Sequence, residues 1–179
     1  DMLDRAVKAI QDGKTPNLDA PLEPISQEVN LHTSTLIPED YLPDIHGRLI
    51  LYKRIANAAT APELDDLYAE FVDRFGLPPD PLKHLFKVTE LKLRAQPLGI
   101  TRLDLGSNGG RLEFSAETKV DPITIIRLVQ AEPGTYRLEG GTTLRVTRKL
   151  EDFEQRIEYA YGLLERLDDT DKEADRATA

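Results

Sequence analysis

The chain has 179 residues and a formal net charge of −9, because 32 acidic residues outnumber 23 basic ones. This acidic balance argues against nucleic acid or an anionic membrane as a direct partner. The absence of cysteine excludes disulfides, thiolate nucleophiles and cysteine-ligated metal sites. The length is that of a single domain with short extensions.

Targeting signals are also missing from the sequence. No apolar run is long enough to cross a bilayer, and no basic and apolar signal peptide opens the chain. We therefore expect a cytoplasmic protein without membrane contact. The chain begins with Asp1 rather than methionine, which predicts that it is part of a longer protein.

The ends of the chain differ in composition from its middle. Apolar residues at helical spacing predict an initial helix over residues 1–13, and the prolines of residues 14–25 predict an extended linker. A globular domain is expected over residues 26–167, opening with a strand at 28–33 where apolar and polar residues alternate. Residues 168–179 hold almost no apolar side chains and predict a disordered acidic tail.

Three helices are predicted next, each with a recognisable start. The first follows the capping residue Asp44 and carries apolar residues along one side, which we expect to be buried: Ile45, Leu49, Tyr52 and Ile55. The second starts with the capping box Thr60–Glu63 and ends before Gly76. The third is capped by Asp80, with a proline in its first turn.

From residue 100 onward the apolar pattern changes to period two. Two hairpins and two further helices are predicted there, at residues 100–115, 121–130, 135–147 and 150–167. The chain thus has about six helices and about five strands, without a regular βαβ rhythm. This order predicts a single α+β domain in which helices pack on a small mixed or antiparallel sheet.

Patterns that indicate catalysis or metal binding are scarce. Gly13–Thr15 resembles the end of a phosphate-binding loop but lacks its upstream glycine. His32, His46 and His84 lie in different predicted elements and have no metal-ligand spacing. We predict no catalytic residue, no cofactor and no metal in this chain.

The helix over residues 60–75 has an unusual charge pattern, with five acidic residues and one basic residue. Four carboxylates repeat along one side of it, away from its apolar residues, at i, i+3, i+7 and i+10: Glu63, Asp66, Glu70 and Asp73. The capping box explains Glu63, and Glu70 could pair with Arg74, but Asp73 opposes the helix dipole. The stripe is either a solvated face or a docking surface for an arginine-bearing partner.

Four phrases resemble, in order and spacing, the C-terminal domain of the bacterial transcription-repair coupling factors. They are LIPEDYLPD (36–44), RLILYKRIA (48–56), EFVDRFGLPP (70–79) and LKLRAQPLGI (91–100). The resemblance extends from about residue 2 to residue 167, which is nearly the whole chain.

The resemblance implies a large, cytoplasmic, bacterial parent protein. This parent would be a helicase-like DNA translocase that uses ATP and magnesium. It would act on RNA polymerase stalled at DNA damage on double-stranded DNA, and recruit nucleotide-excision repair through UvrA. The C-terminal domain of the family is autoinhibitory: it docks on the UvrB-like module of the same polypeptide, masks the UvrA-binding surface and restrains the motor. By this resemblance the fragment is an interaction domain and not itself an enzyme.

The resemblance also implies roles for single residues. In the family, the helix that ends in Asp-Arg-Phe-Gly presents acids to arginines of the UvrB-like module. This assigns Glu70 and Asp73 to the interface, with Asp66 and Glu63 as further members of the stripe. Other polar residues lie in the family phrases, and we expect them to form internal packing or ion pairs: Arg48, Tyr52, Arg54 and Arg74.

Two alternative functions follow from the residues themselves. A DNA-binding accessory domain of the translocase would need a contiguous positive surface. A small independent hydrolase using paired carboxylates would need a concave pocket with convergent groups of shifted pKa.

Overall fold

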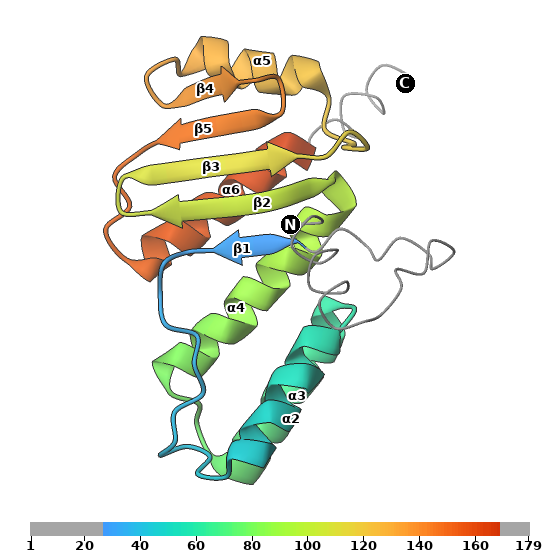
Figure 1. Cartoon of the computed structure of the whole chain (residues 1–179), viewed down its shortest axis with the longest axis vertical. Coiled ribbons are helices and arrows are strands. Elements are labelled where there is room, and N and C mark those ends of the chain that lie inside the picture. The colour runs from blue at the N-terminus through green and yellow to red at the C-terminus, as the bar shows by residue number, and fades with distance from the viewer. Residues whose placement is uncertain (1–26, 169–179) are drawn as a thin grey trace, which may run out of the picture.

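A computed structural model describes residues 27–168 (Figure 1). This part of the chain holds five α-helices, one 3₁₀-helix and five strands. The helices are α2 (Ile45–Asn57), α3 (Ala61–Phe75), α4 (Asp80–Ala95), η1 (Gln96–Leu98), α5 (Pro122–Ala131) and α6 (Phe153–Asp168). The strands are β1 (Glu28–Asn30), β2 (Ile100–Gly106), β3 (Gly109–Phe114), β4 (Tyr136–Glu139) and β5 (Thr143–Thr147). The predicted α+β class is confirmed.

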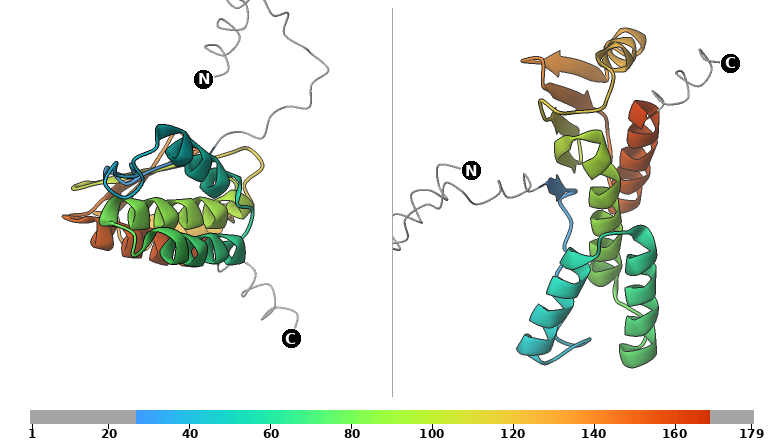
Figure 2. Two further views of the ribbon diagram at one scale, coloured as in Figure 1. Left: turned by 90° about the horizontal axis from the view of Figure 1, so that it is seen from below. Right: turned by 90° about the vertical axis from the view of Figure 1, so that its right-hand side faces the viewer.

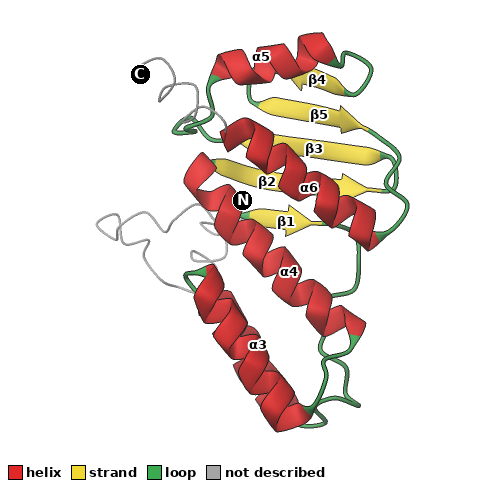
Figure 3. Cartoon of the chain, turned by 180° about the vertical axis from the view of Figure 1, so that it is seen from behind, coloured by secondary structure: helices red, strands yellow, loops and turns green. Residues whose placement is uncertain are grey.

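The strands form one mixed sheet in the order β1-β2-β3-β5-β4. Strand β1 runs parallel to β2, and the remaining neighbours are antiparallel. Helices α4 and α6 lie side by side on one face of the sheet, and α5 lies along its β4 edge (Figure 3). Among the described helices, none covers the opposite face of the sheet (Figure 2, right).

The hairpin between β2 and β3 requires two adjacent glycines. Gly109 has a φ of 100°, a conformation that side chains disfavour. Gly110 approaches the neighbouring strand so closely that an added Cβ would lie 1.8 Å from the carbonyl oxygen of Asp104. The hairpin itself therefore accounts for this glycine-rich segment.

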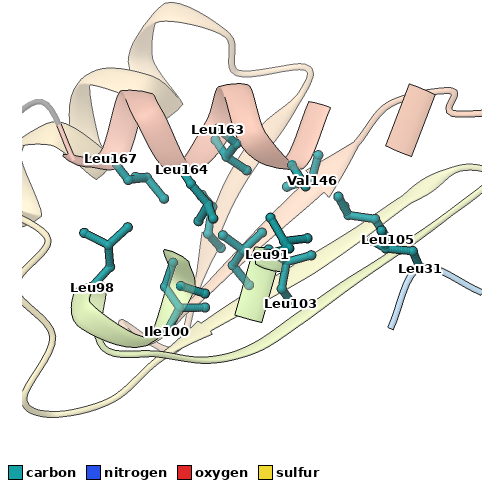
Figure 4. Close-up of a cluster of buried hydrophobic side chains, with 14 of the residues drawn as sticks. Leu31, Leu91, Leu98, Ile100, Leu103, Leu105, Val146, Leu163, Leu164 and Leu167 are labelled. Carbon is teal, nitrogen blue, oxygen red and sulfur yellow. The ribbon is translucent and has the colours of Figure 1, made fainter. Parts of the chain in front are cut away.

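The larger hydrophobic core lies between the sheet and the helices α4 and α6. It gathers the inward side chains of the strands and one face of each helix, including Leu91, Leu98, Ile100, Leu103, Leu105, Val146, Leu163, Leu164 and Leu167 (Figure 4). Because side chains alternate along a strand, the charged residues of the same strands point to the opposite face.

A second, smaller core lies among α2, α3 and the first half of α4. The rings of Phe71 and Phe86 meet edge to face, with centroids 5.6 Å apart. Leu51 and Ile55 of α2 are buried in the same cluster. Helix α4 supplies Phe86 to this core and Leu91 to the larger one, so it connects the helical part of the molecule to the sheet.

The predicted helix caps are confirmed at α2, α3 and α5 but not at α4. Three side chains accept backbone hydrogen bonds in the first turn of their helices: Asp44, Thr60 and Asp121. The prediction that Asp80 caps its helix is wrong. Helix α4 begins at Asp80 itself, after Pro79, and its first turn has no side-chain cap. Asp80 is an acid in that first turn, where it suits the helix dipole.

The predicted buried side of α2 is wrong in part. Ile55 is buried, as expected, but Ile45 and Leu49 are exposed. Leu51, outside the predicted stripe, is buried instead. Helix α2 carries apolar residues on more than one side, and only its neighbours in the fold decide which side is covered.

The first strand is shorter than predicted. It covers Glu28–Asn30 instead of residues 28–33. His32 has a φ of 54°, and its backbone N–H donates to the side chain of Asn30 at 2.9 Å. This local turn ends the strand.

Three predicted segments lie outside the described residues. They are the initial helix at 1–13, which is the sixth predicted helix, the linker at 14–25, and the acidic tail beyond Asp168, the residue at which α6 ends.

Candidate docking surface on α2 and α3

The four carboxylates singled out in the sequence all lie on α3, within an arc of about 80° around its axis. At about 100° per residue, Asp66 and Asp73 lie opposite the buried Phe71. Glu63 and Glu70 lie on the flank that faces α2. The four acids therefore share one side of the helix, and Glu70, at the edge nearest α2, is half-buried.

An open hollow of about 480 Å³ lies between α2 and α3. Helix α2 ends at the turn at residues 58–60, and α3 runs back from that turn, so the two helices are antiparallel. The gap between them widens away from the turn (Figure 2, right). Three of the predicted carboxylates line the hollow together with four other residues: Glu63, Asp66, Glu70, Arg54, Asn57, Ala58 and Leu67. Its wall thus combines three acids and one base with an apolar part.

Arg54 and Glu70 form an ion pair across this hollow. Nη1 of Arg54 donates a hydrogen bond to Oε2 of Glu70. This bond, together with the positive charges of Arg54 and Arg74, holds the pKa of the Glu70 carboxyl below its ordinary value of 4.5. Glu70 is therefore ionised at neutral pH and attached to the last turn of α2.

Sequence reasoning named Arg74 as the local partner of Glu70 and missed Arg54. Arg74 contributes to the field at Glu70 but, within residues 27–168, makes no ion pair with it. The available signal was the turn of three residues between two predicted helices. Such a short turn makes the helices antiparallel neighbours and brings the end of α2 beside α3.

Glu63 has a structural role at the start of α3. Its Oε2 accepts the backbone N–H of Ala59 at 2.8 Å, and its own N–H donates to Oγ1 of Thr60 at 3.3 Å. The predicted capping box is present, with the N–H of Ala59 in place of that of the cap residue. The charge of Glu63 still faces the hollow.

Asp66 and Asp73 are exposed, and in the described part of the chain neither has a hydrogen-bond or ion-pair partner for its side chain. Asp73 lies three residues before Gly76, near the end of α3, where a negative charge opposes the helix dipole. The interactions within residues 27–168 give these two carboxylates no stabilising role. They are available to a partner.

The basic and aromatic residues of the family phrases are engaged internally, as expected. Arg48 donates to the carbonyl oxygen of Leu42 at 2.8 Å. The hydroxyl of Tyr52 accepts the N–H of Ile37 at 2.5 Å. The guanidinium of Arg74 lies over an aromatic ring of its own helix. The contacts of Arg48 and Tyr52 hold the loop before α2 in place.

The histidines do not come together. His32 lies 2.5 Å from Asp104, measured between Nε2 and Oδ1, and His84 stacks on Phe153 with ring centroids 3.9 Å apart. Between residues 27 and 168, no three His, Asp or Glu side chains are grouped so as to hold a metal ion. In the same part of the chain, no helix is long and apolar enough to cross a membrane.

Known sequences resemble this chain along most of its length. The sequence model of the TRCF domain family matches residues 31–125. The transcription-repair-coupling factor of Haemophilus influenzae is 42% identical over 167 residues, which are 93% of this chain and 14% of that protein. That of Escherichia coli is 38% identical over 169 residues, 94% of this chain and 15% of that protein. The chain thus spans about a seventh of the length of these relatives.

The fold has a solved counterpart as well. A crystal structure of the C-terminal domain of a transcription-repair coupling factor superposes with a TM-score of 0.65 and 17% sequence identity, covering 81% of this chain and 96% of that one. At this identity the likeness concerns the fold alone. The family match covers more than half of the chain and includes all four phrases noted in the sequence. The chain therefore belongs to the transcription-repair coupling factor family.

Proposed function

We propose that this chain is the autoinhibitory interaction domain of a transcription-repair coupling factor. The domain docks through α3 on the UvrB-like module of the same polypeptide, masks the surface that binds UvrA and restrains the ATP-dependent motor. Other parts of the longer protein supply translocation on double-stranded DNA, with ATP and magnesium, and the contact with RNA polymerase. The domain itself catalyses no reaction.

The observation that best supports this proposal is the state of Asp66 and Asp73. Both are exposed and without a side-chain partner in the described part of the chain. They lie seven residues apart on one side of α3, a rise of about 10 Å. Two arginines on a facing surface could each form a bidentate pair with one of them.

Glu70 contributes to the same surface in a different way. Arg54 binds Oε2, which leaves Oε1 able to accept further hydrogen bonds. The carboxylate is therefore held in one orientation beside the hollow. A partner arginine would add to an existing pair instead of meeting a free acid, so we assign the larger share of the binding energy to Asp66 and Asp73.

The DNA-binding alternative finds little support on the outer face of the sheet. Arginines are present there, but acids stand between them and pair with them. Arg102 lies 3.0 Å from Glu28, and Arg145 lies 3.1 Å from Glu139. Such an interleaved surface lacks the contiguous positive charge that a phosphate backbone selects.

The hydrolase alternative is not favoured by the hollow. A carboxyl group that acts as a general acid near neutral pH needs a raised pKa. The pKa of Glu70 is lowered, by the hydrogen bond from Arg54 first of all. The hollow is also open to solvent along one side, whereas the raised pKa of a catalytic carboxyl group comes from burial.

Titration of this chain with the separately produced UvrB-like module tests the proposal. Asp66→Arg and Asp73→Arg should each weaken the complex by about 2–5 kcal/mol, because each breaks a charge pair and adds repulsion. UvrA should compete with the wild-type chain for the module.

Asp65→Arg is the matched control. It makes the same charge change on the same helix, but about 80–100° around its axis, on the flank beside α4, so it should bind like the wild type. Glu70 is left intact, because an arginine there would face Arg54 and disturb the fold. Wild-type affinity of the folded Asp66→Arg and Asp73→Arg variants would refute the proposed role of α3.

A further inference from the structure

Exposed apolar side chains gather in the helical part of the molecule. Of the eight large apolar residues that are exposed between residues 27 and 168, five lie before α4: Leu36, Ile45, Leu49, Ile50 and Leu77. Helix α2 alone supplies three of them. Its opposite side buries Leu51 and Ile55 in the smaller core, so α2 is apolar on two sides and covered on one. Helices that are apolar all round are normally buried on all sides.

The exposed side of α2 adjoins the hollow. Ile50 precedes Arg54 by one helical turn and Asn57 by two, and both of these residues line the hollow. Helices α2 and α3 are antiparallel, and Arg54 faces Glu70. One turn back along α2 therefore corresponds to one turn forward along α3, which places Ile50 at the level of Asp73, across the widening gap between the two helices (Figure 2, right). Leu49 follows next around α2, and Ile45 lies one turn before it. The exposed His46 and Lys53 lie above and below the step from Ile50 to Leu49.

We propose that this apolar side of α2 is the second half of the docking surface, and that the partner presents apolar side chains beside its arginines. The inference rests on the proposed function, since it names the chemistry of the same partner. Charged pairs at the rim of an interface contribute mainly specificity, whereas a buried apolar centre carries most of the affinity. Asp66 and Asp73 supply the charged pairs, and Leu49 and Ile50 supply the apolar centre.

The free carboxylates of α3 disfavour a second copy of this chain as the occupant of the patch. A symmetric dimer brings the same surface of both copies together. Such a contact would set the free carboxylates of α3 near those of the other copy, and juxtaposed like charges are unfavourable. A basic partner with apolar neighbours meets both parts of the surface.

Calorimetric titration of the chain with the UvrB-like module tests this inference. The variant combines Leu49→Gln and Ile50→Gln, because added acids would themselves attract arginines. The control combines Ile123→Gln and Ile126→Gln on α5, whose exposures of 55% and 47% match the 54% and 46% of Leu49 and Ile50. The variant should raise Kd about tenfold or more and make the heat-capacity change of binding less negative. The control should stay within about twofold of the wild type.

Each other outcome is informative. If binding depends on Asp66 and Asp73 but the α2 variant binds like the control, the apolar inference is overturned and the proposed function stands. If the wild-type chain does not bind the module, both fall. If the α2 variant abolishes only a self-association seen by analytical ultracentrifugation, the occupant is a second copy and the inference is wrong. Thermal unfolding of both variants checks that they are folded.

Discussion

Glu70 and Asp73 are three residues apart on α3, yet the fold treats them differently. Glu70 is half-buried and bound to Arg54, whereas Asp73 is exposed and has no side-chain partner in the described part of the chain. Spacing along the helix placed both residues away from the apolar stripe. It could not reveal a partner on α2, because that contact depends on how two helices pack.

The pair between Arg54 and Glu70 predicts a pH-dependent effect of Arg54→Met. Pairing lowers the folded-state pKa of Glu70 below 4.5, so its contribution is fully present above about pH 4.5 and is lost as the pH falls through the lowered value. The variant should be less stable than the wild type at pH 7, and this difference should shrink below pH 4.5. Chemical denaturation across the pH range measures it.

Carbon-13 NMR titration of the Glu70 carboxyl provides the site-specific readout. In Arg54→Met, the pKa of Glu70 should move up toward its ordinary value. The control is Glu70→Gln, in which Arg54→Met should cause no pH-dependent loss of stability. An unchanged Glu70 pKa in Arg54→Met would show that the two side chains are not paired in solution.

Secondary elements with local signals were predictable from the sequence. The caps at Asp44, Thr60 and Asp121 are side-chain hydrogen bonds to backbone groups two or three residues away, and the β2–β3 turn depends on its own glycines. The buried side of α2 was not predictable in the same way. Apolar residues on two sides of a helix leave its orientation to tertiary contacts, which the sequence pattern does not contain.

Helix α4 is the element on which both cores depend, and Leu91 is fully buried in the larger one. Leu91→Ala should lower the free energy of unfolding by about 2–5 kcal/mol, since it removes buried methylene groups and leaves a cavity. Leu77→Ala, on the exposed loop before α4, should change it by less than about 0.5 kcal/mol.

Hydrogen exchange measured at increasing denaturant concentration tests whether the two parts of the molecule unfold together. Because α4 belongs to both cores, Leu91→Ala should lower the protection of amides in α3 and in β3 together. Loss of protection in β3 alone, with α3 unaffected, would show that the helical part folds independently of the sheet.

At the scale of the whole molecule, the candidate docking surface lies on α2 and α3, beyond the edge of the sheet where β1 lies (Figure 1). The outer face of the sheet carries paired charges, whereas the helical part carries unpaired acids beside exposed apolar residues. The family resemblance implied an interface role for Asp73 from sequence alone. The adjoining apolar surface required the fold, because only the fold shows which side of α2 is left exposed beside the hollow.

The affinity of the full-length protein for UvrA tests the account most directly. If the domain masks the UvrA-binding surface, a full-length protein carrying Asp66→Arg and Asp73→Arg should bind UvrA more tightly than the wild type, by about tenfold or more as the closed form is depopulated. The protein with Asp65→Arg should bind UvrA like the wild type. Equal UvrA affinity of all three folded proteins would contradict the account and leave the acids of α3 as a solvated surface.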